Sequence, residues 1–357
     1  MKIVRILDWP LKRYYGESHL FYRWKNLLGD LGLKVSLHYD HNDPAVKDAD
    51  CLIIHSRYFK AWQNTATRNP QNQEELLAFL CSCKYTVNRL IWFDAADSTG
   101  SADFLLLPYV DIFLKKQMLK NKNYYTQTEG YPNLRPWLPS DQSATACFTP
   151  CDSTQLDKMR LAWNVGMDDF RYYGYKMSRL SNFLGHQLYP LKFSSVLKER
   201  PIDAVFRGKL HQSAGAQNQI ARQRNEVLTV FNDLKRNIAK GPGVPKRIYW
   251  RELRNSKVGV SPFGFGEICH RDFETFISGG LLVKPDMEHM ETFPNWFIKD
   301  ETYISVDWQM TSLKTVLEAV LDNYPSYLHI AIRGQANFKK HYMDGEGFAT
   351  HFKKAIS

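Results

Sequence analysis

The sequence of 357 residues lacks any apolar run long enough to cross a membrane. A transmembrane helix needs about 20 consecutive apolar residues, so no membrane span is predicted. The N-terminus also lacks the layout of a secretory signal, because Lys2, Arg5 and Asp8 interrupt its apolar positions. We therefore expect a cytoplasmic protein, with peripheral contact at the inner face of an anionic membrane as the alternative that its basic charge allows.

Cysteine is scarce, and its spacing is not that of a disulfide framework or a zinc site. The six cysteines are Cys51, Cys81, Cys83, Cys147, Cys151 and Cys269. Cys147 and Cys151 are close in sequence, but no histidine or second cysteine pair accompanies them at metal-ligand spacing. We expect reduced thiols and no metal site. Internal repeats are absent as well.

Two separate alternations of short apolar runs with amphipathic segments predict an α/β protein of two domains. The first alternation contains KIVRIL, KVSLHY, CLIIHS and RLIWF, and the second begins at PIDAVFRGKLH. We predict two Rossmann-like domains that face each other across a cleft. The first covers residues 1–190 and the second 201–340, and a helix over 341–357 packs toward the first domain. A long helix is predicted over about 217–239 of the second domain.

In the first domain, the loop after RLIWF is the richest in side chains suited to catalysis. It reads DAADSTG and places Asp94 and Asp97 just beyond the end of a strand. A carboxylate held at a strand edge can act as a general base, although Asp and Ser are also common turn residues. We take both aspartates as catalytic candidates and favour Asp94, which directly follows Phe93. The next segment, PYVDIFLKKQML, predicts a strand and a helix.

The second domain contains a strand, a glycine-rich loop, a helix and another strand in immediate succession. Residues 258–260 and 281–283 are the apolar runs, Gly264 and Gly266 lie in the loop, and a helical pattern covers 268–277. Such a unit directs backbone N–H groups and a helix N-terminus at a phosphate. An anion site is therefore predicted at this loop.

Arg271 and Glu274 follow the loop and share one face of the predicted helix. The arginine can neutralise a phosphate, and the glutamate can accept hydrogen bonds from sugar hydroxyls. The alternative is a solvated ion pair beside glycines that only make turns.

The pattern SPFGFGE…RDFETFISGGLLVKP resembles the nucleotide-sugar-binding segment of glycosyltransferases of the GT-B fold, including exostosin-like and bacterial surface-glycan enzymes. The resemblance implies that residues 261–267 contact the donor phosphates or sugar, Arg271 the diphosphate and Glu274 the ribose. Six residues separate Glu267 from Glu274, whereas the retaining enzymes have seven, so the stereochemical outcome stays open. The full set of implied donor-binding residues is Arg207, Lys209, Ser261, Gly264, Gly266, Glu267, Arg271 and Glu274.

The resemblance further implies transfer of a sugar from a nucleotide-sugar to a glycan or lipid-linked acceptor, in surface polysaccharide or lipopolysaccharide assembly. No cofactor is expected beyond the donor itself. Basic groups and helix dipoles can stabilise the departing diphosphate, so a metal held by the protein is not required. No Asp-x-Asp motif is placed as in the other glycosyltransferase fold.

The net charge of +10 favours an anionic partner. Basic residues are spread along the chain, with clusters at 115–122 and 246–254, and no nucleic-acid-binding motif accompanies them. We attribute the charge to acidic nucleotide donors and an anionic membrane surface, and expect no nucleic-acid partner. The alternatives are a catalytically silent nucleotide- or glycan-binding scaffold and a basic nucleic-acid-binding protein.

Overall fold

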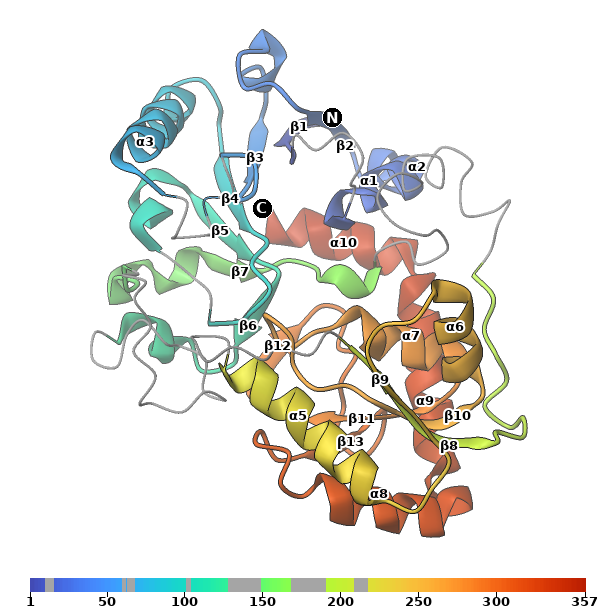
Figure 1. The fold of residues 1–357 in the computed structure, drawn as a ribbon. Helices are drawn as coiled ribbons and strands as arrows, with labels where there is room; N and C mark the ends of the chain where they lie inside the picture. The colour runs from blue at the N-terminus through green and yellow to red at the C-terminus, as the bar shows by residue number, and fades with distance from the viewer. Residues whose placement is uncertain are drawn as a thin grey trace.

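The structure, a computed structural model, describes residues 1–9, 16–59, 62, 68–100, 104–127, 149–167, 191–208 and 218–357 (Figure 1). Two parallel β-sheets form the centres of its two halves, as the predicted α/β class requires. The N-terminal half occupies the upper part of Figure 1 and the C-terminal half the lower part. The boundary predicted near residue 190 borders a stretch outside the described residues and stays a prediction.

The first sheet has six strands in the order β2-β1-β3-β4-β5-β7. Every residue of β3, β4 and β5 is buried, as in a parallel sheet that is covered on both faces. The strands are β1 (Lys2–Leu7), β2 (Leu33–His38), β3 (Cys51–His55), β4 (Leu90–Asp94), β5 (Ile112–Lys115) and β7 (Met159–Leu161).

Alternate residues of β3 belong to different hydrophobic clusters, because side chains along a strand point to opposite faces. Cys51 and Ile53 share a cluster with residues of α1 (Leu20–Arg23), α2 (Lys25–Asp30) and α10 (Gly345–Ala355). Leu52 and Ile54 share another with residues of α3 (Pro70–Lys84). Helices therefore cover both faces of the sheet.

The second sheet has five parallel strands in the order β13-β11-β10-β8-β9. They are β8 (Ile202–Arg207), β9 (Ile238–Gly241), β10 (Ser256–Val260), β11 (Leu281–Pro285) and β13 (Ile304–Val306). The helices of this half are α5 (Asn218–Asp233), α6 (Lys246–Arg254), α7 (His270–Ser278), α8 (Leu313–Asp322) and α9 (Tyr324–Tyr342). The predicted unit of strand, glycine loop, helix and strand is confirmed as β10, α7 and β11. Gly279 ends α7 in the left-handed conformation, with φ 69°.

Two local predictions are wrong. The helix predicted over 217–239 ends at Asp233, and residues 238–241 form β9, because Ile238 and Ala239 pair with Ala204 and Val205 of β8. The helix predicted after residues 112–115 is instead the short strand β6 (Gln117–Leu119). In both cases, pairing with a distant strand decides the conformation, and this is invisible in the local pattern.

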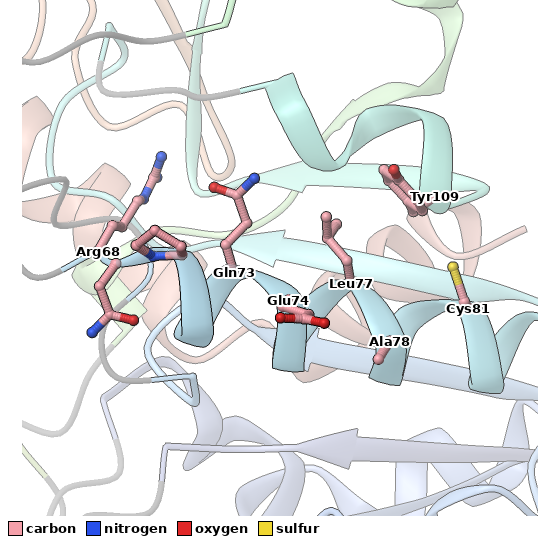
Figure 2. Close-up of a pocket in the computed structure, with 9 residues that line it drawn as sticks. Arg68, Gln73, Glu74, Leu77, Ala78, Cys81 and Tyr109 are labelled. Atoms are coloured by element: carbon pink, nitrogen blue, oxygen red, sulfur yellow. The ribbon is translucent and has the colours of Figure 1, made fainter.

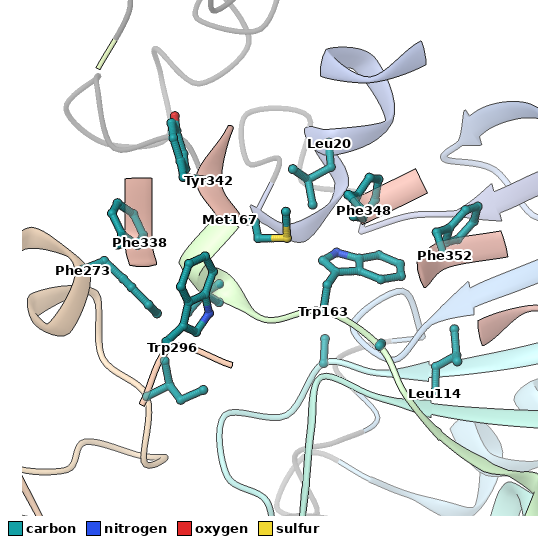
Figure 3. Close-up of a cluster of buried hydrophobic side chains, with 14 of the residues drawn as sticks. Leu20, Leu114, Trp163, Met167, Phe273, Trp296, Phe338, Tyr342, Phe348 and Phe352 are labelled. Carbon is teal, nitrogen blue, oxygen red and sulfur yellow. The ribbon is translucent and has the colours of Figure 1, made fainter. Parts of the chain in front are cut away.

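Backbone pairing and aromatic packing join the two halves. Strand β6 pairs antiparallel with β12 (Met290–Thr292) of the second half. Helix α10 packs on the first half, with the rings of Phe352 and Phe21 5.0 Å apart. One hydrophobic cluster extends from Trp163 to Trp296, so it is shared by the two halves (Figure 3). Within the described ranges, no helix is both long enough and apolar enough to cross a bilayer.

Candidate functional site

The carboxyl ends of β4 and β10 meet, and their following loops are in direct contact. Residues 95–100 follow β4, and residues 261–267 follow β10; the second stretch is called the donor loop below. At Gly266, an added Cβ would overlap the carbonyl oxygen of Asp97. The close approach of the two backbones therefore requires glycine.

Glu267, the last residue of the donor loop, is fully buried in this contact. Its Oε1 accepts hydrogen bonds from the Oγ1 of Thr99 at 2.6 Å and from the Oγ of Ser98 at 3.2 Å. Its Oε2 accepts from the backbone N–H of Thr99 at 3.1 Å. The predicted donor ligand is thus bonded to the loop of the other half.

Replacing Gly266 with alanine is expected to push the two loops apart and to lower the free energy of unfolding by about 1–3 kcal/mol, the usual cost of overpacking. Gly264→Ala is the matched control, because a Cβ there lies 3.4 Å from the Cys269 Sγ, which is ordinary contact. Urea denaturation of both variants measures the difference. Equal stability of the two would contradict the close approach at Gly266.

Two arginines lie near the N-terminus of α7. Arg271 donates from Nη2 to the carbonyl of Arg207 at 3.0 Å, and its buried Nε has no hydrogen-bond partner in the part of the chain that the structure describes. Arg224, on α5, is close enough for the charge of Arg271 to act on it: burial lowers the pKa of Arg224, and Arg271 lowers it further. Two neighbouring guanidinium groups at a helix N-terminus favour an anion.

The donor loop is held by α5 and β11 beside these arginines. Gln223 of α5 accepts a hydrogen bond from the backbone N–H of Phe263 at 2.7 Å. The backbone N–H of Ser261 donates to Val283 at 2.8 Å. The Oγ of Ser261 is buried and has no hydrogen-bond partner within the described residues, although such groups are normally paired. Ser261, Gly264 and Arg271 remain the residues predicted for the anion site, and Arg224 is a further basic group within electrostatic range of Arg271.

Glu274 lies one turn further along α7 and is partly exposed. Its Oε2 accepts a hydrogen bond from the hydroxyl of Tyr249 at 2.6 Å. Burial raises the pKa of Tyr249 well above its usual value, and the Glu274 carboxylate raises it further, so the phenol keeps its proton. His270, at the start of α7, is exposed.

Arg207 is directed away from the two arginines of α5 and α7. Its Nε and Nη2 donate to the two oxygens of Glu252 at 2.8 and 2.7 Å, and its Nη1 donates to the carbonyl of Lys240. The charge predicted for the donor is therefore neutralised within the domain. Lys209, the other predicted residue of that strand end, lies outside the described residues.

The two catalytic candidates lie in different surroundings. Asp94 is buried, and its Oδ2 is 2.7 Å from the Nζ of Lys115, while its Oδ1 accepts from the N–H of Ala96 at 3.1 Å. The Asp97 side chain is 48% exposed, and its Oδ1 lies 3.2 Å from the Nζ of Lys116 and 3.4 Å from Arg57. Of the two, Asp97 is the one open to a substrate.

A buried charged cluster of the first half supports Asp97, and its central pair, Glu17 and Lys116, was not predicted from the sequence. Lys116 lies 3.1 Å from Glu17, and both are 3% exposed. Burial alone would raise the pKa of Glu17, but Lys116 and His55 hold it well below its usual range. The Nδ1 of His55 accepts from the backbone N–H of Arg57 at 3.1 Å, which leaves Nε2 to face Glu17. The sequence feature that could have revealed this cluster is the basic run at 115–122, whose first residues were predicted to be helical.

A hollow of about 650 Å³ lies along α3, and none of the predicted site residues lines it (Figure 2). Among its lining residues are Arg68, Gln73, Leu77, Cys81 and Tyr109. The described part of the chain has no group of three or more His, Cys, Asp or Glu side chains arranged to hold a metal ion.

Comparisons with known proteins show what the fold resembles. The sequence matches no family model, and a search of curated proteins finds no match. The structure is similar to T4 phage BGT in complex with UDP-glucose, at 11% identity, TM-score 0.50 and full coverage of both chains. It is also similar to the DNA-modifying enzyme β-glucosyltransferase, at 10% identity and TM-score 0.50, over 100% of this chain and 99% of that one.

A third structure, Anabaena HepE in complex with UDP and glucose, has 8% identity and a TM-score of 0.44 over 100% of this chain and 99% of that one, too low a similarity to support an argument. The two similarities at 0.50 show the fold, which is GT-B as the resemblance implied. None of the comparisons bears on the narrower exostosin-like resemblance, which stays a prediction.

Proposed function

We propose that this protein transfers a glycosyl group from a nucleotide-sugar donor to an acceptor hydroxyl. The observation that carries the proposal is the contact between the loops of the two halves: the donor loop, which leads into the N-terminus of α7 and Arg271, meets the backbone of Asp97 at Gly266. The GT-B fold adds support, because structures that share it at TM-score 0.50 are those of glucosyltransferases with UDP-glucose as their substrate.

Each side chain has a defined part in this reaction. Arg224, Arg271 and the helix N-terminus stabilise the negative charge that develops on the departing diphosphate. Glu274 accepts hydrogen bonds from the ribose with the carboxylate oxygen that Tyr249 does not use. Asp97 accepts the proton of the attacking hydroxyl as the new bond forms. The anomeric configuration is inverted in this scheme.

The acceptor we propose is a glycan or a lipid-linked glycan, as in the assembly of surface polysaccharide. A nucleic-acid acceptor is the second candidate, favoured by the net charge of +10 and by the DNA-modifying role of one structural neighbour. The expectation that nucleic acid is no partner is therefore not supported. Binding to duplex DNA that weakens steeply with salt, together with sugar transfer to it, would select the second candidate.

A thermal-shift panel of nucleoside diphosphates and nucleotide-sugars tests the function directly. Stabilisation by one nucleotide family, with no effect of the matching nucleoside, is the expected result, because the arginines recognise phosphate. Release of free diphosphate in the presence of candidate acceptors then separates an enzyme from a silent scaffold. No stabilisation by any nucleotide would contradict the proposal.

Replacing Glu274 with glutamine keeps the shape of the side chain and removes its charge. We expect the affinity for the nucleoside diphosphate to weaken by about 1.5–3 kcal/mol, the scale of a hydrogen bond to a charged group. Calorimetric titration measures it. Glu288→Gln, at an exposed position, is the control. Unchanged affinity in Glu274→Gln would remove this residue from the site.

A further inference from the structure

We propose that Glu267 is a positioning residue, which fixes the loop of Asp97 against the donor loop and so couples donor binding to the placement of Asp97. The proposal rests on the proposed transferase function. It assigns to Glu267 a role different from the contact with the donor that the sequence implied.

The contacts of the carboxylate are the first observation. Three hydrogen bonds that it accepts, from the Oγ1 and N–H of Thr99 and the Oγ of Ser98, come from the other half of the chain. The side chain is 0% exposed, so protein groups already surround the carboxylate. His289 lies 3.6 Å from Oε1 on another side. The carboxylate is thus enclosed by protein.

The loop of Asp97 is held from two more sides. The Nε2 of Gln117 donates to the carbonyl of Asp97 at 2.5 Å, and the hydroxyl of Tyr125 donates to the carbonyl of Thr99 at 2.8 Å. Gly266 abuts the same Asp97 carbonyl from the donor loop. The backbone of Asp97 therefore lies between Gln117 of its own half and Gly266 of the other.

The donor loop itself connects this contact to the anion site. Ser261, whose buried Oγ has no hydrogen-bond partner within the described residues, begins the loop, and Glu267 ends it, bonded to Thr99. The backbone N–H of Gly264 donates to the carbonyl of Gly266 at 3.0 Å, which makes the intervening turn compact. Any shift of the loop when a diphosphate binds is passed to residues 97–99 through Gly266 and Glu267.

Hydrogen exchange of the free protein tests the positioning role without any substrate. Glu267→Gln keeps the size of the side chain but offers only one oxygen to the Thr99 donors. Thr99→Val removes the hydroxyl donor with little change of shape. We expect the amides of residues 95–100 to exchange about tenfold faster in both variants, as is usual when a local contact is lost. Glu288→Gln is the matched control, and melting temperatures confirm that each variant is folded.

Uridine diphosphate is the probe for the coupling. In the wild-type protein, saturation with it is expected to slow the exchange of residues 95–100 roughly fivefold, at the low end of typical allosteric coupling. In Glu267→Gln and Thr99→Val, the diphosphate should still bind within about threefold of the wild-type affinity, because its ligands on α5 and α7 remain. It should no longer slow exchange in that loop.

Two results would overturn the proposal. Exchange of residues 95–100 that is unchanged by Glu267→Gln shows that Glu267 does not hold the loop. Weaker diphosphate binding in Glu267→Gln but not in Thr99→Val shows that Glu267 is a donor ligand. Failure of the wild-type protein to bind the diphosphate counts against the proposed function, and exchange in the free protein then decides on the positioning role alone.

Discussion

Replacing Lys284 with methionine is expected to lower the free energy of unfolding by about 3–5 kcal/mol, the cost of leaving one member of a buried ion pair without its partner. The Nζ of Lys284 lies 2.6 Å from the Oδ2 of Asp272, and both side chains are 0% exposed. The same Oδ2 accepts from the N–H of Cys269 at 3.0 Å, which caps α7. The lost pair therefore affects the helix end that carries Arg271.

Urea denaturation measures this effect, and a second substitution separates its causes. Asp272→Asn combined with Lys284→Met removes both charges and keeps an oxygen for the cap. We expect the double variant to regain most of the lost stability, since an apolar or neutral pair in such a place costs little. If Lys284→Met alone lowers the free energy of unfolding by less than about 1 kcal/mol, the effect is that of an exposed ion pair. Such a result would contradict the burial of the pair between Lys284 and Asp272.

The sequence predicted the parts of the fold that depend on local patterns. From apolar runs and a glycine at the helix end, the unit of strand, helix and strand was predicted at 258–260, 268–277 and 281–283. In the structure, these three elements cover 256–260, 270–278 and 281–285. Gly279 shows why local patterns predict such an element. A helix that ends in the left-handed conformation favours glycine at that position, whatever the rest of the fold. Local signals of this kind also identified the donor loop and Arg271.

The rest of the site depends on contacts between distant residues. The apolar run of this strand was predicted to end at residue 283, but Lys284 is also a fully buried residue of β11. Glu17 and Lys116 are 99 positions apart, and Glu267 and Thr99 are 168 apart. A periodic pattern of apolar residues gives no information about contacts between residues so far apart in the sequence. Arg207 was predicted to bind the donor, yet Glu252 of α6 forms an ion pair with it.

The same limit applies to the choice between the two aspartates. Asp94 was favoured because it follows the strand directly, and that position is what buries it against Lys115. A base needs a fixed backbone and one oxygen open to the substrate. Asp97 has its carbonyl bonded to Gln117 and its Oδ1 beside Lys116, while nearly half of its side chain is exposed. The structure therefore favours Asp97, which the sequence had ranked second.

Asp97→Asn is accordingly expected to lower turnover by about a hundredfold or more, the usual contribution of a positioned base. The affinity for the diphosphate should stay within about threefold of wild type, because the substituted side chain is not among the groups that bind phosphate. Asp94→Asn is the matched comparison: it weakens a buried ion pair, so it should lower stability. Steady-state rates, calorimetry and denaturation of both variants distinguish these effects. If Asp97→Asn keeps normal turnover, or if the product retains the donor's anomeric configuration, the base does not lie in this loop.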